Sequence, residues 1–306
     1  MDCIILAGNQ EGYKPVMGES CKASLEVAET PILVLMLRQI FQISQLERII
    51  IIGNSEELQD LVNNRFDEGL DRVHFVQQKS NIIDSIVFAI ESTENEPDPD
   101  RQVLVIPSDL PLMLAEEIDE FIFKTQGTDF DYYLGLVREE AIKRFAPTEA
   151  KPGITMQCFP FREGFFRINN LHVCKPHKFL ESDLIKKTYQ LRHQKNIKSV
   201  LKSMLVLCSL LFRKPSAFSM YLKMQMVHMV PSPRLSSWIR SKLILKDVED
   251  IISFLINVSF KTITTSLGGV AIDVDKFDDF ETIKLRFNEW FDLQKQIVRD
   301  TGLTKK

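Results

Sequence analysis

Cysteine is scarce in this chain and is never paired in sequence. The five cysteines among 306 residues are odd in number, scattered, and never form a C-x-x-C pair. This distribution argues against a disulfide framework and against a structural zinc site, and it is typical of reduced thiols. We therefore expect a cytoplasmic protein.

Long apolar runs are also missing. No apolar run reaches about 18 residues without a charge, so no transmembrane helix is predicted. The chain enters a strand pattern at Asp2-Cys3-Ile4-Ile5-Leu6 without a basic segment and a long apolar segment before it, so a signal peptide is not expected. The net charge of -4 gives no overall attraction to nucleic acid, and we expect no nucleic-acid partner.

The composition that remains is that of a globular protein. Hydrophobic residues make up 44% of the chain and charged residues 26%, and 306 residues are enough to bury a full core. Apolar runs predict strands that alternate with helical periodicities over residues 31–43, 55–65, 82–91 and 115–124. The predicted strands are 3–6, 48–52, 74–76, 103–106 and 132–137. This alternation predicts an α/β fold, a mostly parallel Rossmann-like sheet with helices on both faces.

The middle of the chain has a different character. Residues 181–257 have a helical pattern rich in Met, Leu, Lys and Arg and are interrupted by prolines, which predicts an inserted helical subdomain. Residues 1–180 and 258–306 then form the α/β core. Basic and apolar residues are interleaved in the insertion, and four interpretations stay open: a subdomain packed on itself with a basic solvated face, contact with a membrane surface, a homodimer face, and a lid over the acceptor.

The loop after the first strand has features of a phosphate-binding loop. Ligands of parallel sheets bind at the carboxyl ends of the strands. Leu6-Ala7-Gly8 ends the first strand, and the loop after it contains two further glycines, which bring backbone N–H groups near a ligand. Lys14 and Lys22 add charge suited to a triphosphate. A surface loop with solvated lysines is the alternative.

Asp109 is the first candidate metal ligand. It follows an apolar strand directly and lies between two prolines, so it presents a carboxylate at the carboxyl edge of the sheet. Mg²⁺ takes one or two protein carboxylates together with phosphate oxygens. Capping of the following helix is the alternative, but Glu116 and Glu117 already supply an acidic first turn to that helix.

Asp273 and Asp275 form a second acidic pair. In a strand they lie on the same face, and two neighbouring carboxylates repel, which suggests a bound cation or a basic partner. The alternative is that Asp278 or Asp279 caps the last helix and the other carboxylates are solvated. Capping explains Asp278 or Asp279 but explains Asp273 poorly.

Taken together, these segments resemble the MobA-like nucleotidyltransferase family, which has a GT-A-type fold. The matching segments occur in the family's order over residues 2–137 and roughly 259–285: Leu6-Ala7-Gly8, Lys22-Ala23-Ser24-Leu25 with Thr30-Pro31-Ile32-Leu33, Ser108-Asp109-Leu110-Pro111, and Ile272-Asp273-Val274-Asp275. Two positions depart from the family pattern. Lys14 stands where an arginine is usual, and Cys21 stands where a proline is usual.

The resemblance implies roles for particular residues. Leu6, Ala7 and Gly8 would approach the base, and Lys14 and Lys22 the phosphates. Asp109 would hold Mg²⁺ together with Asp273 or Asp275. The remaining positions implied by the family are Ser80 and Ser85, for base and ribose, and Arg167 and Asn170, just before a strand, for the acceptor.

The reaction we expect is transfer of a nucleoside monophosphate from an NTP, with CTP or GTP favoured, to a phosphorylated or otherwise anionic small acceptor. Pyrophosphate would leave, and Lys22 and Asp109 would be the catalytic residues. Two alternatives remain: a glycosyltransferase that uses a nucleotide-sugar, since Asp273-Val274-Asp275 has the D-x-D form, and a catalytically inactive nucleotide-binding scaffold.

Overall fold

The computed structural model describes residues 1–8, 21–66, 69–79, 82–93, 98, 100–180 and 215–303. Lys14 and Ser80 lie outside the described residues, as does the first part of the predicted insertion, 181–214.

The described residues form one large mixed sheet with the strand order β10-β7-β9-β6-β1-β4-β5, in which β8 pairs with β9. The six strands β10, β7, β6, β1, β4 and β5 run in the same direction, and β9 runs antiparallel between β6 and β7. The predicted mostly parallel α/β fold is therefore confirmed. The bounds are β1 (Asp2–Leu6), β4 (Ile49–Gly53), β5 (Val73–Gln77), β6 (Val103–Pro107), β7 (Tyr132–Arg138), β8 (Phe159–Phe161), β9 (Gly164–Cys174) and β10 (Phe260–Thr265). A separate hairpin pairs β2 (Glu26–Val27) with β3 (Thr30–Pro31).

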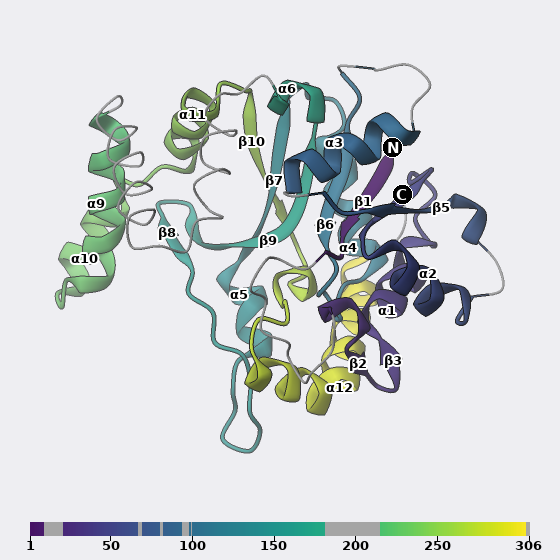
Figure 1. Cartoon of the computed structure of the whole chain (residues 1–306). Coiled ribbons are helices and arrows are strands. Elements are labelled where there is room, and N and C mark those ends of the chain that lie inside the picture. The colour runs from purple at the N-terminus through teal and green to yellow at the C-terminus, as the bar shows by residue number, and fades with distance from the viewer. Residues whose placement is uncertain are drawn as a thin grey trace, which may run out of the picture.

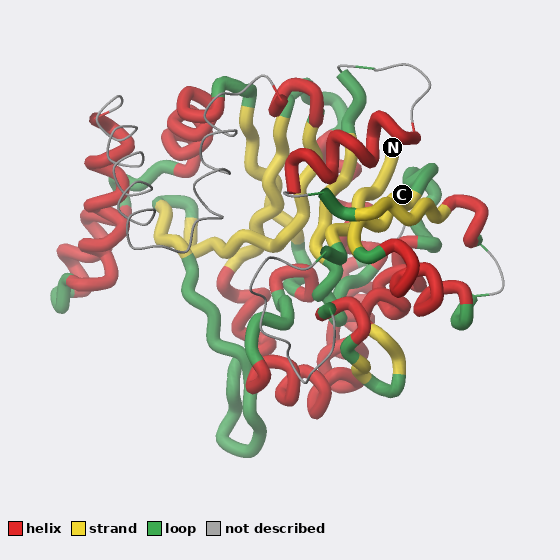
Figure 2. The backbone as a smooth tube through the Cα atoms, viewed as in Figure 1, coloured by secondary structure: helices red, strands yellow, loops and turns green. Residues whose placement is uncertain are grey.

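Alternation along the central strands creates the two faces of the sheet. Cys3 and Ile5 of β1 pack with the buried sides of α1 (Ile32–Ile40), α2 (Ser55–Asn63), α4 (Ala115–Thr125) and α12 (Phe277–Thr301). Ile4 points the other way, into a smaller cluster covered by α3 (Ile82–Thr93). Successive strand residues point to opposite faces, so both faces of these strands are buried. Figure 2 shows the helices flanking the sheet.

The far edge of the sheet is covered differently. Helices α9 (Pro215–Met229), α10 (Pro233–Arg240) and α11 (Leu245–Ile256) follow the gap in the described residues. Val227, Ile239 and Leu243 from this region are buried against Leu136 and Phe166 of the sheet. In Figure 1 these helices lie beyond β8 and β10, on the side away from α1 and α2. Within the described part of the chain, no helix is long and apolar enough to span a bilayer.

The last helix begins differently from the prediction. α12 starts at Phe277, and Lys276 occupies the N-cap position without a side-chain cap bond. Asp278 and Asp279 lie in the first turn, so capping by either of them is wrong. Their carboxylates instead interact favourably with the positive end of the helix dipole. Short elements complete the fold: α5 (Glu139–Ile142), α6 (Pro176–Leu180) and the 3-10 turns η1 (Lys22–Ser24), η2 (Leu70–Arg72), η3 (Lys143–Phe145) and η4 (Gly269–Ala271).

Candidate active site

The carboxyl ends of β1, β4 and β6 meet at one edge of the sheet. The Ala7 N–H donates to the Ile52 carbonyl at 2.8 Å, and the Ser108 N–H donates to the Leu6 carbonyl at 3.2 Å. These bonds continue the parallel ladders beyond the strands. As a result, the chain after Leu6 and the chain after Ser108 begin side by side at the edge where α/β proteins bind ligands.

Gly8 marks a close approach between two loops. A Cβ built on Gly8 would lie 2.0 Å from Oε1 of Gln78, the residue that follows β5. The next turn is closed by Ser85, whose buried hydroxyl accepts a hydrogen bond from the Lys79 N–H at 2.8 Å. Ser85 therefore stabilises the start of α3, and its predicted contact with base or ribose stays a prediction.

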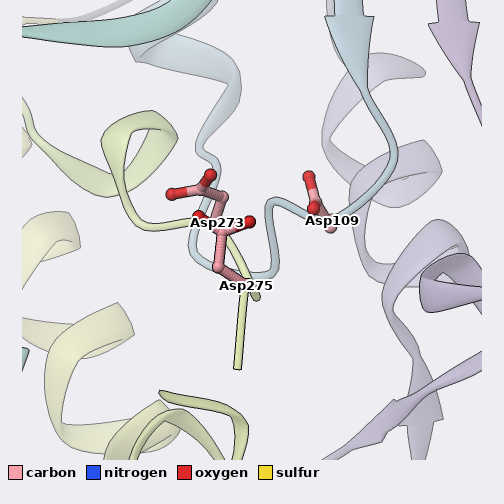
Figure 3. Close-up of side chains that lie close together, drawn as sticks. All are labelled: Asp109, Asp273 and Asp275. Carbon is pink, nitrogen blue, oxygen red and sulfur yellow. The ribbon is translucent and has the colours of Figure 1, made fainter. Parts of the chain in front are cut away.

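Three aspartates from distant parts of the sequence come together at this edge. Figure 3 shows Asp109 in the loop after β6, with Asp273 and Asp275 on the segment that precedes α12. Each offers one carboxylate oxygen, and these oxygens all lie within 4.8 Å of one another. Asp273 and Asp275 do not lie in a strand as expected. They follow η4 in irregular chain, which the Val274 N–H joins to the Asp109 carbonyl at 3.2 Å.

Lys22 lies against this cluster. Its Nζ donates to Oδ2 of Asp109 at 2.7 Å and to Oδ1 of Asp275 at 3.1 Å. Burial lowers the pKa of Lys22, but the charges of Asp109 and Asp275 outweigh that effect and leave the pKa above its ordinary value. Lys22 is thus a fixed cation, and the three carboxylates with this one lysine keep a formal excess of negative charge.

Two of these carboxylates have raised pKa values. Burial raises the pKa of Asp109 despite the neighbouring Lys22. Burial raises the pKa of Asp273 to about 6, and the charges of Asp275 and Asp109 add to the effect. The second oxygen of Asp109, Oδ1, is buried and has no hydrogen-bond partner. Carboxylate oxygens with unmet charge are the donor set that Mg²⁺ prefers, so these residues fit a divalent cation.

The predicted acceptor residues lie within β9, whereas the sequence placed them before a strand. Arg167 donates from Nη1 to the Gln157 carbonyl at 3.4 Å, and its charge lowers the pKa of Asp273 in opposition to burial. Asn170 has a φ of 62° and donates from Nδ2 to the Val270 carbonyl at 3.1 Å. Arg167 therefore acts on the acidic cluster through its charge, and Asn170 holds the turn that leads to Asp273.

His172, also in β9, has a structural environment. Its Nδ1 lies 2.6 Å from the hydroxyl of Tyr132, and burial lowers the pKa of His172 to about 4. The imidazole is therefore neutral at physiological pH.

Sequence reasoning missed the residues that anchor the turn before Asp273. Glu117 of α4 is fully buried and accepts hydrogen bonds from Oγ1 of Thr265 at 2.9 Å and from the Val270 N–H at 3.3 Å. Gln294 of α12 is also buried and donates to the Leu112 carbonyl at 3.0 Å, beside Gly269. The spacing of Glu117 could have indicated its burial, because it lies four residues before Phe121, on the apolar face of its helix.

Comparison with known structures agrees with this architecture. A hypothetical transferase from Thermus thermophilus has a TM-score of 0.65 and 21% identity, covering 91% of this chain and 98% of that chain. Two others are similar at lower TM-scores: a 4-diphosphocytidyl-2C-methyl-D-erythritol synthase from Anaerococcus prevotii (0.49; 11% identity, covering 94% and 97%) and a 2-C-methyl-D-erythritol 4-phosphate cytidylyltransferase from Francisella tularensis (0.47; 11%, covering 95% and 100%). The Thermus similarity shows the fold.

Sequence comparison gives the family. A search of curated proteins finds no match. The family model described as MobA-like NTP transferase domain matches residues 3–206, which is more than half of the chain. The motifs named from the sequence up to Asp109 fall within that match. This chain therefore belongs to the MobA-like NTP transferase family.

Proposed function

We propose that this protein is a Mg²⁺-dependent nucleotidyltransferase, which transfers the NMP group of an NTP to a small phosphorylated or otherwise anionic acceptor and releases pyrophosphate. One observation carries the proposal. Three aspartates have carboxylate oxygens within 4.8 Å of one another, and a lysine bonded to two of them lies among them, at the ligand-binding edge of the sheet.

Asp109, Asp273 and Asp275 would hold the metal ion. The excess negative charge and the unpartnered buried oxygen of Asp109 support this assignment. A bound Mg²⁺ would neutralise charge on the phosphate oxygens and so favour departure of pyrophosphate.

The residues of the chain itself supply positioning and charge. Lys22, kept protonated by its two carboxylate partners, would donate to a phosphate oxygen of the NTP. The backbone at Ala7 and Gly8 would lie against the base of the NTP. The favoured NTPs are CTP and GTP. Arg167 and Asn170 would face the acceptor. An acceptor phosphate is ionised near neutral pH, so it can attack the α-phosphorus without a general base.

The test is pyrophosphate release from each of the four NTPs with Mg²⁺, across a panel of sugar phosphates, polyol phosphates and phosphonates. The expected result is release that depends on both the acceptor and the metal and is lost in Asp109→Asn. Asp278→Asn is the matched control, because Asp278 is an exposed aspartate just beyond the cluster, in the first turn of α12. That variant should keep full activity.

Other outcomes point to the alternatives. Nucleoside diphosphate released from nucleotide-sugars, with no pyrophosphate from any NTP, would establish a glycosyltransferase instead. Nucleotide binding without turnover in either assay would indicate an inactive scaffold.

The Lys22→Met variant distinguishes the role of the lysine charge in turnover from binding of the metal by the three aspartates. Removing the lysine removes a cation that competes for Asp109 and Asp275, so we expect turnover to fall while Mg²⁺ binding, measured by calorimetry, is kept or tightened. Loss of metal binding in this variant would contradict the assignment of the three aspartates as an independent ligand set.

A further inference from the structure

Helix α9 exposes a stripe of large apolar side chains. Its Ala217 and Val227 are buried, and Val227 packs against the sheet. The opposite stripe is exposed at helical spacing, and Met229 at its end is 77% exposed. The stripe consists of Phe218, Tyr221, Leu222, Met226 and Met229. A helix with apolar residues on opposite sides normally has both sides covered, and within the described part of the chain this stripe of α9 has no apolar partner.

Helix α10 continues this character. Ile239 is buried, whereas Leu235 and Trp238 are exposed, Trp238 by 61%. Figure 1 shows α9 and α10 as the outermost elements on their side of the molecule, beyond β8 and α11. An exposed tryptophan beside aliphatic residues is typical of a segment at a lipid–water interface, because the ring has both an apolar body and a polar N–H.

The sequences of α9 and α10 contain basic residues and no acidic residue, whereas the following helix α11 carries Asp247, Glu249 and Asp250. Residues 184–246 contain thirteen Lys and Arg residues and no Asp or Glu, although the whole chain has a net charge of -4. On α9, on α10 and just after them, the described cations are Lys223, Arg234, Arg240 and Lys242, whereas Lys246 of α11 pairs with Asp250 at 2.7 Å. Cations set among exposed apolar side chains complement a surface that is anionic at its headgroups and apolar beneath them.

Two other partners fit less well. A twofold dimer through this face would bring two basic surfaces together, and their cations would repel one another. Nucleic acid would meet the cations, and bases could stack on Phe218, Tyr221 and Trp238, but Leu222, Met226 and Met229 would then lack an apolar partner.

We propose that the exposed face of α9 and α10 docks on the surface of an anionic lipid bilayer. The helices would lie in the interface, with the apolar stripe among the headgroups and acyl chains and the cations at the lipid phosphates. This inference is independent of the reaction, because none of these residues belongs to the candidate active site.

The test is co-sedimentation of the full chain with vesicles of phosphatidylcholine alone and of phosphatidylcholine mixed with phosphatidylglycerol. We expect binding to the anionic vesicles, weakening as salt rises. Met229→Asp and Trp238→Asp should abolish most of it. In Arg234→Ala and Lys242→Ala, each lost cation should weaken binding about fivefold.

Matched controls come from the opposite part of the molecule. Leu285 of α12 is 68% exposed and Lys295 of the same helix is exposed, so Leu285→Asp and Lys295→Ala make the same chemical changes elsewhere. Neither should alter binding. Thermal unfolding followed by circular dichroism identifies any variant whose loss of binding reflects misfolding.

Three results would overturn the proposal. The first is absence of binding to anionic vesicles, or an equal loss in the control variants. The second is a dimer in light scattering that Met229→Asp dissociates, without vesicle binding. The third is binding of a single-stranded oligonucleotide that the same variants abolish, again without vesicle binding.

Discussion

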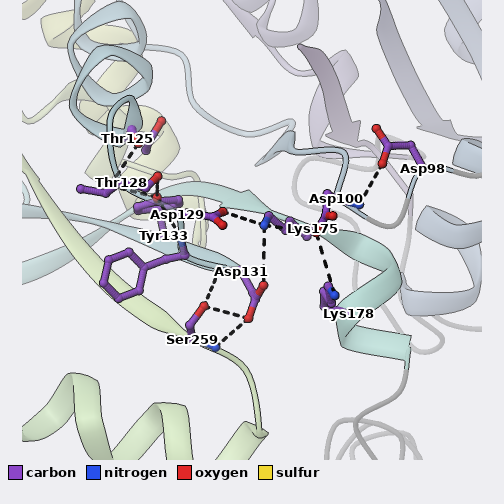
Figure 4. A network of polar contacts seen from close by, with 11 residues as sticks. Asp98, Asp100, Thr125, Thr128, Asp129, Asp131, Tyr133, Lys175, Lys178 and Ser259 are labelled. Carbon is purple, nitrogen blue, oxygen red and sulfur yellow. Dashed lines mark hydrogen bonds and ion pairs between the residues drawn. The ribbon is translucent and has the colours of Figure 1, made fainter.

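Two clusters of aspartate and lysine lie at opposite edges of the sheet. At the carboxyl edge, Asp109, Asp273 and Asp275 share Lys22. At the amino edge, Lys175 lies among carboxylates that precede β6 and β7 (Figure 4). The compositions are similar, so composition alone does not separate a site from a structural network.

The two clusters differ in whether their buried charged atoms all have ion-pair or hydrogen-bond partners. Lys175 is buried and pairs with Asp129 at 2.7 Å and with Asp100 at 3.4 Å, and both of these carboxylates are largely exposed to water. Asp131, the more buried acid, accepts from the Ser259 N–H at 2.9 Å and from its hydroxyl at 2.8 Å. At the carboxyl edge, by contrast, a buried oxygen of Asp109 has no partner. A buried carboxylate oxygen without a hydrogen-bond partner therefore distinguishes the candidate site from the amino-edge network.

The largest effect should follow from Asp109→Asn. We expect pyrophosphate release to fall by at least about 100-fold, because a group placed for charge stabilisation in the transition state is lost. The free energy of unfolding should not fall, since the raised pKa of Asp109 means that its ionised form costs stability, and Lys22 keeps Asp275 as a partner. Activity assays and urea unfolding measure both. Retained activity, or a clear loss of stability, would contradict the conclusion that the carboxyl-edge cluster is a functional site and not a structural network.

Glu117→Gln tests a third buried acid, one with hydrogen bonds but no cation bonded to it in the described structure. Burial raises the pKa of Glu117 from 4.5 to about 8. Between these values the unfolded chain releases a proton that the folded chain keeps, so stability decreases as pH rises from about 4.5 to 8. One pKa unit corresponds to about 1.4 kcal/mol, which makes the total a few kcal/mol.

Urea unfolding at pH 5 and pH 8 measures this dependence. It should be clearly smaller in Glu117→Gln than in the unmodified chain, and unchanged in Glu116→Gln, whose side chain is only half-buried on the same helix. If the unfolding free energy changes equally between pH 5 and pH 8 in all three proteins, the hydrogen bonds from Thr265 and Val270 keep Glu117 ionised.

Asp131→Ala should have the opposite effect to Asp109→Asn. It leaves the Ser259 N–H without its acceptor, and we expect a loss of about 2 kcal/mol in the free energy of unfolding with activity unchanged. Asp129→Ala is the matched control, because that carboxylate is 86% exposed and water screens its ion pair with Lys175. Loss of activity in Asp131→Ala at normal stability would show that the amino edge also takes part in the reaction.

The smallest effect concerns Asn170, which has a left-handed backbone. Asn170→Ala and Asn170→Gly both remove the bond to the Val270 carbonyl, but only alanine is strained at this φ, by about 1 kcal/mol. Urea unfolding should rank glycine as the more stable variant. A KM for the acceptor that rises several-fold in both would support a role in acceptor binding; an unchanged KM would leave Asn170 a structural residue.

The sequence was informative where structure is local. Apolar runs ending at Gly8, Gly53 and Asp109 are sufficient to predict the parallel strands β1, β4 and β6 and the edge of the sheet that holds the candidate site. Sequence could not show that Asp273 and Asp275 follow a 3-10 turn outside any strand, because that turn is held by distant partners. Glu117 accepts a hydrogen bond from the Val270 N–H, and the Asp109 carbonyl accepts one from the Val274 N–H. No local pattern in the sequence encodes these contacts.

The amino-edge network was not predicted for the same reason. Asp131 and Ser259 are 128 positions apart, and each alone resembles an ordinary polar residue before a strand. Burial and mutual contact, which only the fold creates, give them their importance.

The separation of the cluster along the chain has a consequence for biosynthesis. Lys22 and Asp275 are 253 positions apart, so the first is translated long before the second. At about 5–20 residues per second, the interval is on the order of tens of seconds. For most of that time β10, the outer neighbour of β7, and two of the three carboxylates of the acidic cluster have not been synthesised. The nascent chain therefore cannot assemble the three candidate metal ligands until Asp275 has been synthesised, and on the proposed function a product truncated before Asp273 would not bind the metal.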